Sequence, residues 1–458
     1  MMLSRRCKLV LKGLMRAFCL LSALWLCGTA KAESLSLIAD EETEALLRDM
    51  IKPLYQAANV RFNPYDVYIV NDQTLNAFVA DGNAMFVNTG TLIEADDYNQ
   101  VVGVLAHETG HIQGGHILRQ KIKLHNVQQA TMASLIAAGV AGAVSGRPDV
   151  GMAIMLGSQT SALHNVTAYM VQEERSADEA AVQLLSKTNQ SPAGLREFMK
   201  KIQQQNMLNG IEETPYFRTH PVTSERLTFM SKAAANKPFV SNRNMERRFE
   251  MVKAKLIGFL EKPEQTFKRY PAKDSSFPAL YAQSIALFKQ FKLQEALAKL
   301  DMLIGREPDN PFLYELKAQF LMESGKLPEA VKNYRKAYEL LPTSPLLQES
   351  LAQAMLENSP SPKDVNEIIG LLNKSLIKRA NAYTWLLLAR AYGMKGEEAY
   401  ANYAAAEFSV RIRAFETAEK QIKAARKANP SAALSLKLDD IEKRVKKELA
   451  EREPVRRR

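Results

Sequence analysis

The sequence predicts an α+β domain, mostly helical with a small β-sheet, followed by an all-α solenoid of repeated helix pairs. Three observations predict this organisation. Short runs of β-forming residues precede strongly helical segments in the first half of the chain. A His-Glu-x-x-His motif at residues 107–111 follows these runs. In the second half, small residues and prolines recur with a period of 34 residues.

The chain opens with the pattern of a secretory signal. Five basic residues precede an apolar run over residues 17–27, and an Ala-x-Ala cleavage pattern follows at residues 30–32. The basic residues are Arg5, Arg6, Lys8, Lys12 and Arg16. The apolar run is too short to span a bilayer comfortably. We therefore expect a cleavable signal peptide over residues 1–32 and export to a bacterial periplasm.

All three cysteines, Cys7, Cys19 and Cys27, lie in this signal. The mature protein is therefore expected to be stabilised by core burial without disulfides. Removal of residues 1–32 leaves 55 basic and 50 acidic residues, a net charge of about +5 compared with +11 for the whole chain. This mild charge gives little support for binding to nucleic acid.

The first folded elements are expected to be a helix and a small sheet. Residues 39–58 predict an amphipathic helix, and residues 67–70 and 84–88 are short β-type runs separated by residues 76–79 and a turn at 81–83. The apolar face of the helix is formed by Leu46, Leu47, Met50, Ile51 and Leu54. An exposed edge strand in this sheet could pair with an extended peptide. An ordinary packed hairpin is the open alternative.

The His-Glu-x-x-His motif predicts a metal site on a buried helix. His107 and His111 are four residues apart, so on a helix they share one face, as two imidazoles must to bind one metal ion. Glu108 falls beside the metal, where a carboxylate can take a proton from a bound water. The preceding turn is strongly apolar, with Val101, Val102, Val104 and Leu105.

A third metal ligand has two candidate locations. His116 follows His107 by nine residues, so in a continued helix it lies on the opposite face, and it misses by one residue the last position of the longer His-Glu-x-x-His-x-x-Gly-x-x-His signature. We interpret His116 as a supporting residue. Glu174 and Asp178 share one face of a second helical pattern over residues 169–185. Two carboxylates on an apolar face need a positive partner, unless they form a solvated charge cluster.

The two motifs together resemble the M48 family of zinc metallopeptidases, because Glu174-Arg-Ser-Ala-Asp178 fits the family's second motif, Glu-x-x-Ala-Asp. The resemblance implies a zincin-type fold and one Zn²⁺ per chain, bound by His107, His111 and Glu174. It also implies that Glu108 is the general base and that Asp178 supports the site. Chemistry alone does not exclude Glu173 as the ligand, but the family register favours Glu174.

A third segment, Arg218-Thr219-His220-Pro221 followed by Arg226, resembles the His-Pro segment of a periplasmic branch of the family. The resemblance implies that His220 is a removable fourth zinc ligand that holds the enzyme latent, with Arg226 in support. A loop histidine without a metal role is the alternative. The segments 131–144 and 150–163 are apolar but too short to cross a bilayer. We expect them to form a helical hairpin over the cleft, or alternatively to touch the membrane transiently.

The second half predicts tetratricopeptide repeats. The pairs Ala296 and Ala330, Pro308 and Pro342, and Ala318 and Ala352 are each separated by 34 residues. Trp385, Leu388, Ala389 and Tyr392 match the spacing of a repeat's first helix. We expect about four repeats over residues 279–430, the third degenerate at 359–362, with a concave face that binds other proteins. A purely structural scaffold is the alternative.

The predicted organisation is therefore a signal peptide (1–32), an M48 metallopeptidase domain (34–235), a connecting region (236–276), the repeats (277–430) and a charged C-terminal helix and tail (431–458). Within the connecting region we expect a helix over 245–260 and a linker over 262–278, and residues 442–458 are interpreted as a solvated charged tail.

The resemblance implies a periplasmic zinc endopeptidase that acts in the quality control and assembly of outer-membrane proteins. Its expected substrates are unfolded or misassembled outer-membrane proteins, and its repeats are expected to contact the β-barrel assembly machinery. No nucleic acid and at most peripheral membrane contact are expected. The alternative is a chaperone-like binding module whose metal site is latent or structural.

Overall fold

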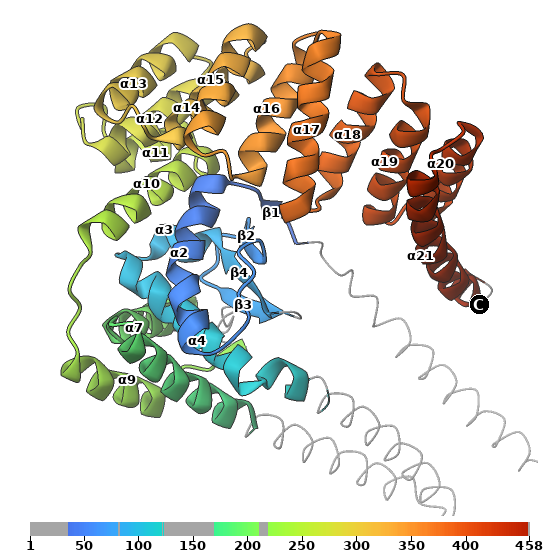
Figure 1. Cartoon of the computed structure of the whole chain (residues 1–458). Helices are drawn as coiled ribbons and strands as arrows, with labels where there is room; N and C mark the ends of the chain where they lie inside the picture. The colour runs from blue at the N-terminus through green and yellow to red at the C-terminus, as the bar shows by residue number, and fades with distance from the viewer. Residues whose placement is uncertain (1–34, 81–82, 121, 123–168, 210–218, 457–458) are drawn as a thin grey trace, which may run out of the picture. The chain divides into compact units, whose positions relative to one another are not determined.

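The computed structural model describes residues 35–80, 83–120, 122, 169–209 and 219–456 of the chain. The predicted signal peptide and the apolar segments 131–144 and 150–163 lie outside these residues. From Leu37 onward the described residues form one compact unit, in which a small sheet is followed by a long series of helices (Figure 1). Within the described residues, no helix combines the length and the apolar character needed to cross a membrane.

Helix α2 (Glu41–Ala57) confirms the first predicted helix and its apolar face. It begins where the side chain of Asp40 accepts a hydrogen bond from the backbone N–H of Thr43, which satisfies one of the free donors of the first turn. All five predicted apolar residues of the helix are at most 1% exposed and belong to one large core that also includes residues of α4 and the sheet.

The sheet contains four strands in the order β1-β2-β4-β3: β1 (Leu37–Ile38), β2 (Val67–Val70), β4 (Ala84–Asn88) and β3 (Ala77–Ala80). The bounds of β2 and β4 are those that the sequence predicts. Strand β3, which the sequence analysis treated as a connection, pairs antiparallel with β4, while β2 and β4 pair in parallel. The sequence left open an edge strand or an ordinary packed hairpin. Strand β3 is both, because it forms a hairpin with β4 and lies at the edge of the sheet.

Helix α3 (Thr89–Glu94) leads into α4 (Tyr98–Gly114), which carries the His-Glu-x-x-His motif and confirms the second predicted helix. Helix α4 ends at Gly115, whose φ of +67° is the left-handed conformation that glycine adopts without strain. A further helix over residues 169–187 packs very closely on α4 at Gly110, where an added Cβ would lie 2.7 Å from the carbonyl oxygen of Ala177. This close approach brings the second motif against the first.

Three helices follow: α7 (Ala193–Asn209), α9 (Ser224–Asn236) and α10 (Arg243–Leu260). Helix α7 packs against α4. The backbone of Leu195 is so close to Gly103 that a Cβ added at Gly103 would lie 2.4 Å from the backbone nitrogen of Leu195. Helix α10 corresponds to the predicted connecting helix. The predicted linker at residues 262–278 is not simply extended, because it contains helix α11 (Pro263–Arg269), which packs on the first repeat helix.

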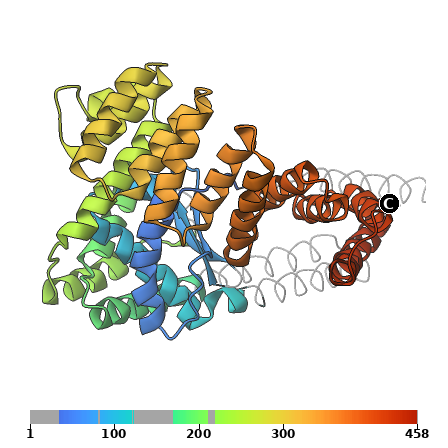
Figure 2. The ribbon, with the colours of Figure 1, turned by 45° about the horizontal axis from the view of Figure 1, so that its top comes forward.

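The remainder of the chain is a region of TPR-like helical repeats, as predicted. Its successive helices pack against one another in chain order (Figure 2). They are α12 (Phe277–Lys289), α13 (Leu293–Arg306), α14 (Pro311–Glu323), α15 (Leu327–Leu340), α16 (Pro345–Glu357), α17 (Pro362–Lys378), α18 (Ala382–Met394), α19 (Glu398–Arg411), α20 (Phe415–Lys427) and α21 (Ala432–Arg456). Ala296 and Ala330, at the 34-residue period, are fully buried.

Two details of the repeat prediction are corrected. Residues 359–361 connect α16 to α17, which begins at Pro362, and the two helices form an intact pair around the segment interpreted as degenerate. Within the tail interpreted as solvated, residues 442–458, the described part buries Val445 where α21 packs on α20. The buried residues of α21 are Leu434, Leu438, Ile441 and Val445.

The N-terminal turn of α2 contacts α10 and the repeat region through charged and polar side chains, which we call the α2 junction. Lys255 pairs with Asp40, the Tyr281 hydroxyl donates to Glu42 (2.8 Å), and the Ser344 hydroxyl donates to Glu41 (2.5 Å). Arg379, at the end of α17, donates to both carboxylate oxygens of Glu44 at 2.7 Å. The junction thus consists of Asp40, Glu41, Glu42 and Glu44 with Lys255, Tyr281, Ser344 and Arg379.

Candidate metal centre

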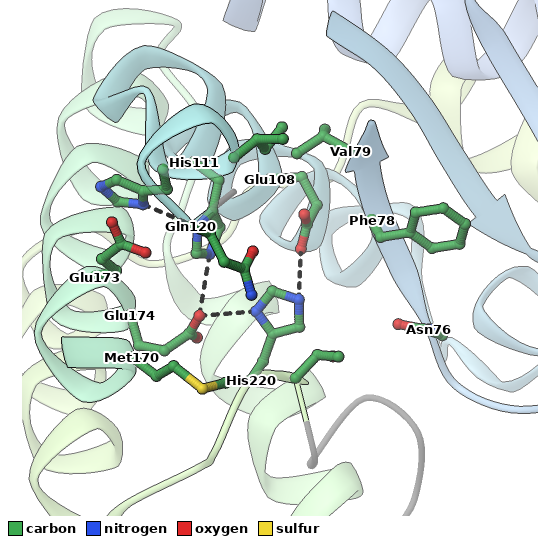
Figure 3. A pocket seen from close by; sticks show the side chains of 13 residues that line it. Asn76, Phe78, Val79, Glu108, His111, Gln120, Met170, Glu173, Glu174 and His220 are labelled. Atoms are coloured by element: carbon green, nitrogen blue, oxygen red, sulfur yellow. Dashed lines mark hydrogen bonds and ion pairs between the residues drawn. The ribbon is translucent and has the colours of Figure 1, made fainter. Parts of the chain in front are cut away.

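Four buried side chains from three segments converge on one point of the N-terminal half (Figure 3). His107 and His111 come from α4, Glu174 from the helix over residues 169–187, and His220 from the bend before α9. One potential ligand atom from each lies within 4.8 Å of the others. Because His220 follows His107 by 113 positions in the chain, helix packing and not sequence proximity assembles the group.

The spacing of the donor atoms fits a bound metal ion. Nε2 of His107 lies 3.1 Å from Nε2 of His111, and the two oxygens of Glu174 lie 3.3 Å and 3.2 Å from these nitrogens. Tetrahedral ligands with bonds of about 2 Å are separated by about 3.3 Å. Glu173, the open alternative, instead lies 3.4 Å from Nε of Arg119. The structure therefore places Glu174 in the metal-binding group.

Asp178 and Arg226 contact the metal-binding residues on the side away from the point where their ligand atoms converge. Nδ1 of His107 lies 2.9 Å from Asp178, which leaves Nε2 of the ring facing Glu174. Arg226 donates to both oxygens of Asp178 at 2.6 Å and 2.9 Å, and its Nη1 lies 2.8 Å from Glu174. A carboxylate behind a ligating histidine fixes the tautomer and orientation of the ring. Sequence proximity gives no sign of the contact between Arg226 and Asp178, which are 48 residues apart.

The electrostatics of the centre follow from burial and these contacts. Burial opposes the charged form of His107, but hydrogen bonds to Asp178 and Glu174 outweigh it and raise the pKa of His107 to about 10. Burial lowers the pKa of His111 to about 3, with Glu174 acting in the opposite direction. Burial alone would raise the pKa of Glu174, but the surrounding histidines hold it well below its usual range.

Glu108 differs from the other carboxylates of the centre. It is buried, and burial raises the pKa of its side chain. Its Oε1 has no hydrogen-bond partner among the described residues and lies 3.6 Å from Nε2 of His220. Nδ1 of the same imidazole lies 2.9 Å from Glu174. The His220 ring therefore stands between Glu108 and Glu174.

A cavity of about 290 Å³ opens beside the group, lined by Glu108, His111 and His220 on one side and by Asn76, Phe78 and Val79 of the β3 region on the other. From the sequence, residues 76–79 were expected only to connect two strands, with no role at the site. The only local signal was a short run of strand-forming residues at 77–80, which is weak evidence for a strand.

His116 lies elsewhere than the continued-helix argument predicted. Because α4 ends at Gly115, the chain turns and brings Nδ1 of His116 to 2.9 Å from Nδ1 of His111. The helix does not continue past Gly115, so the opposite face that a continued helix would give His116 does not apply, and its supporting role stays a prediction. His116 contacts a metal-binding histidine on the side away from Glu174.

A buried His-His-Glu group, with a further glutamate on the same helix as the histidines, defines the class of metal-dependent peptidases. Residues 41–234 match the family described as Peptidase family M48. The part of the chain that matches this family carries the metal-binding group, and the TPR-like repeats follow it.

Proteins of similar sequence include several proteases. The beta-barrel assembly-enhancing protease of Yersinia pestis is 24% identical over 316 residues, which cover 66% of this chain and 63% of the relative. The protein of the same name from Escherichia coli (strain K12) is 23% identical over 318 residues, covering 67% and 64%. The metalloprotease LoiP of Escherichia coli (strain K12) is 28% identical over 162 residues, covering 35% and 59%. The match therefore spans less than two thirds of the length of these relatives.

Solved structures resemble the chain more weakly. YrrB, a TPR protein with an unusual peptide-binding site, aligns with a TM-score of 0.28 and 13% identity, covering 42% of this chain and 91% of that one. Yeast Tom70 aligns with a TM-score of 0.34 and 12% identity, covering 89% and 77%.

Proposed function

We propose that the protein is an exported zinc endopeptidase that is kept latent by His220 and acts on extended protein segments. The observation that carries the proposal is the position of His220, whose ring lies between Glu174 of the metal-binding group and Oε1 of Glu108. Zn²⁺ fits the nitrogen and oxygen donors of His107, His111 and Glu174. When bound there, it would supply Lewis-acid polarisation of a carbonyl and an acidified water.

Side chains of the protein would accept the proton, orient the metal-binding histidines and keep the site closed. Glu108 lines the cavity and is positioned to accept a proton at Oε1, as a general base does. Asp178 and Arg226 hold His107 with Nε2 directed into the centre. His116 contacts Nδ1 of His111 and would fix the orientation of that ring. His220 must leave its place before water and substrate can reach Glu108.

The substrate is proposed to bind as an added strand on β3. This strand is at the edge of the sheet and borders the cavity beside the metal-binding group. An extended peptide can add to such an edge through main-chain hydrogen bonds. Because only unfolded or locally open chains present such a segment, the geometry favours non-native proteins as substrates.

The cellular role is proposed from the relatives. Two of them are named beta-barrel assembly-enhancing proteases, which supports a role in the quality control and assembly of outer-membrane proteins in the periplasm. The basic and apolar N-terminal sequence supports export. The TPR-like repeats are proposed to contact protein partners, such as the β-barrel assembly machinery.

A chaperone-like binding module with a closed metal site is the second candidate, and the contact of His220 with Glu174 favours it. Casein cleavage by the zinc-loaded full-length protein separates the two functions. We expect His220→Ala to cleave casein faster than the wild type, because the general base becomes accessible. Adding Glu108→Gln to this variant should reduce cleavage by about 10²- to 10⁴-fold while zinc stays bound.

The opposite results would favour the binding module. If His220→Ala gains no activity and Glu108→Gln loses none, the peptidase proposal is wrong. Bound zinc in His107→Ala provides the check on the centre itself, because unchanged metal content would show that the ion is bound elsewhere.

A further inference from the structure

Three aromatic rings form a continuous column across the sheet. Tyr68 on β2, Phe86 on β4 and Phe78 on β3 are direct neighbours in the strand register. The ring centroids of Tyr68 and Phe86 are 4.9 Å apart, as are those of Phe86 and Phe78, with interplanar angles of 19° and 2°. All three are half-buried, whereas Val67 and Met85, the preceding residues on β2 and β4, are buried. The column therefore lies on the sheet face opposite the core.

Phe78 is the last ring of this column because β3 is at the edge of the sheet. The backbone N–H of Asn88 on β4 donates to the carbonyl of Asn76 (3.0 Å), which sets the alternation of the antiparallel pair. Asn76 and Phe78 accordingly direct their backbone groups to β4, and Ala77 and Val79 direct theirs to the other side. Because Ala77 is fully buried, an added strand would pair through Val79, which is half-buried.

The same strand borders the metal-binding group. Phe78 and Val79 both line the cavity that contains Glu108 and His220. The ring of Phe78 points away from Glu108 and His220 (Figure 3). A peptide lying along β3 would therefore direct alternate side chains to two faces, one on the side of the metal centre and one on the side of the aromatic column.

We propose that the aromatic column selects substrates, by stacking Phe78 on an aromatic side chain of the bound peptide strand. The inference rests on the proposed function and names a substrate class for it: extended segments with an aromatic residue at the position opposite Phe78. Directly opposed residues on antiparallel strands have Cβ atoms about 4.5–5.5 Å apart, a separation that lets the new ring continue the column. Phe78 is a specificity-determining residue in this arrangement.

The expected preference is modest and measurable. Aromatic pairs contribute about 0.5–1.5 kcal/mol beyond area burial, which corresponds to about a 2- to 10-fold difference in kcat/KM. A series of internally quenched peptides tests it with the zinc-loaded full-length His220→Ala protein. The peptides share one sequence in which a single Phe, Tyr or Ala is moved through each position around the cleaved bond. We expect one position in the peptide at which kcat/KM is higher with Phe or Tyr than with Ala by about 2- to 10-fold.

Variants of Phe78 test whether the aromatic column causes the preference for an aromatic residue in the peptide. In the His220→Ala background, Phe78→Ala should abolish the aromatic preference and Phe78→Tyr should retain it. Phe291→Ala is the matched control, because it removes a phenylalanine that is 96% exposed in the repeat region and should keep the preference. Zinc content and thermal unfolding show whether each variant is folded.

The outcomes distinguish this inference from the proposed function. Cleavage without a position-specific aromatic preference, or a preference that persists in folded Phe78→Ala, overturns the inference alone. If Phe78→Ala does not fold, the Phe78→Tyr and peptide measurements decide. Absence of cleavage of every peptide overturns the proposed function instead.

Discussion

The metal centre and the α2 junction both bury several charged side chains, but they satisfy them in opposite ways. At the junction, every carboxylate has a donor within the protein: Lys255 pairs with Asp40 and Glu42, Tyr281 donates to Glu42, Ser344 donates to Glu41, and Arg379 donates to Glu44. At the centre, the donor atoms of four residues converge within 4.8 Å, and Oε1 of Glu108 has no hydrogen-bond partner among the described residues. Convergence, more than the number of buried charges, distinguishes a metal site from a structural cluster.

The difference has a physical basis. A buried ion pair offsets the cost of desolvation only when hydrogen bonds complete both partners. The junction meets this requirement within the protein, so it needs no ligand. In the centre, two imidazoles and a carboxylate direct their lone pairs toward one another, an arrangement that a cation would stabilise. Changes to single carboxylates should therefore affect metal binding at the centre and only stability at the junction.

The largest expected effect is on metal binding by Glu174→Gln. This change removes the negative charge from the metal-binding group, so zinc affinity should fall by more than about 10²-fold. Loss of a residue that only hydrogen-bonds to a metal ligand typically lowers metal affinity by about 10- to 100-fold. Competition with a chromogenic chelator measures the affinity. Glu173→Gln is the matched control, because its side chain faces Arg119 and should leave zinc affinity nearly unchanged. Equal losses in both variants would contradict the assignment of Glu174.

The next effect is a pH dependence of stability at the junction. Burial raises the pKa of Glu44 from 4.5 to about 7, against the opposing effect of Arg379. The folded state therefore binds more protons than the unfolded state between about pH 4.5 and 7, and the free energy of unfolding falls as pH rises through this window. Glu44→Gln lacks this pH dependence. The free energy of unfolding of Glu44→Gln minus that of the wild type should therefore rise by about 2–3 kcal/mol from pH 5 to pH 8.

Urea unfolding of both proteins at the two pH values measures this difference. Asp49→Asn provides the control on the same helix, because the Asp49 side chain is 55% exposed and pairs with Arg248 at the surface. A difference between wild type and Glu44→Gln that does not change with pH would contradict the prediction. Zinc content should be the same in both proteins, since the junction contributes no atom to the metal-binding group.

A smaller effect is expected from Asp178→Asn. This change keeps the size of the side chain but weakens its contact with Nδ1 of His107 and its pairing with Arg226. Zinc affinity should fall by about 10- to 100-fold, as is typical when the partner behind a metal-binding histidine is removed. The same chelator competition measures it. An affinity equal to that of the wild type would show that Asp178 does not support the metal-binding group.

The sequence predicted the features that depend on local periodicity. The apolar face of α2, the bounds of β2 and β4, and the 34-residue repeat all follow from spacing within a short window. Within the centre, the four-residue spacing predicted that His107 and His111 lie together, whereas Glu174 and His220 were expected from the resemblance to a family; the structure brings all four together.

Features that depend on distant contacts or on a single backbone conformation were not predictable in this way. Strand β3 gains its pairing from β4, and the position of His116 depends on the left-handed conformation of Gly115. The charges at the start of α2 look like an ordinary acidic first turn, which favours a helix N-terminus without any distant partner. Their donors Ser344 and Arg379 follow about 300 residues later in the chain, a relation that no local pattern carries.

The smallest expected effect separates the junction from helix capping. Ser344 donates to Glu41 (2.5 Å) and also caps α16 by accepting a hydrogen bond from the backbone N–H of Leu347 (3.1 Å). Ser344→Ala should therefore lower the free energy of unfolding by about 1 kcal/mol for the cap and by about a further 1 kcal/mol for the lost donor to a buried carboxylate. Ser361→Ala is the matched control, since Ser361 caps α17 at the surface and contacts Asp364. A loss in Ser344→Ala no greater than in Ser361→Ala would mean that the α2 junction adds nothing measurable at this contact.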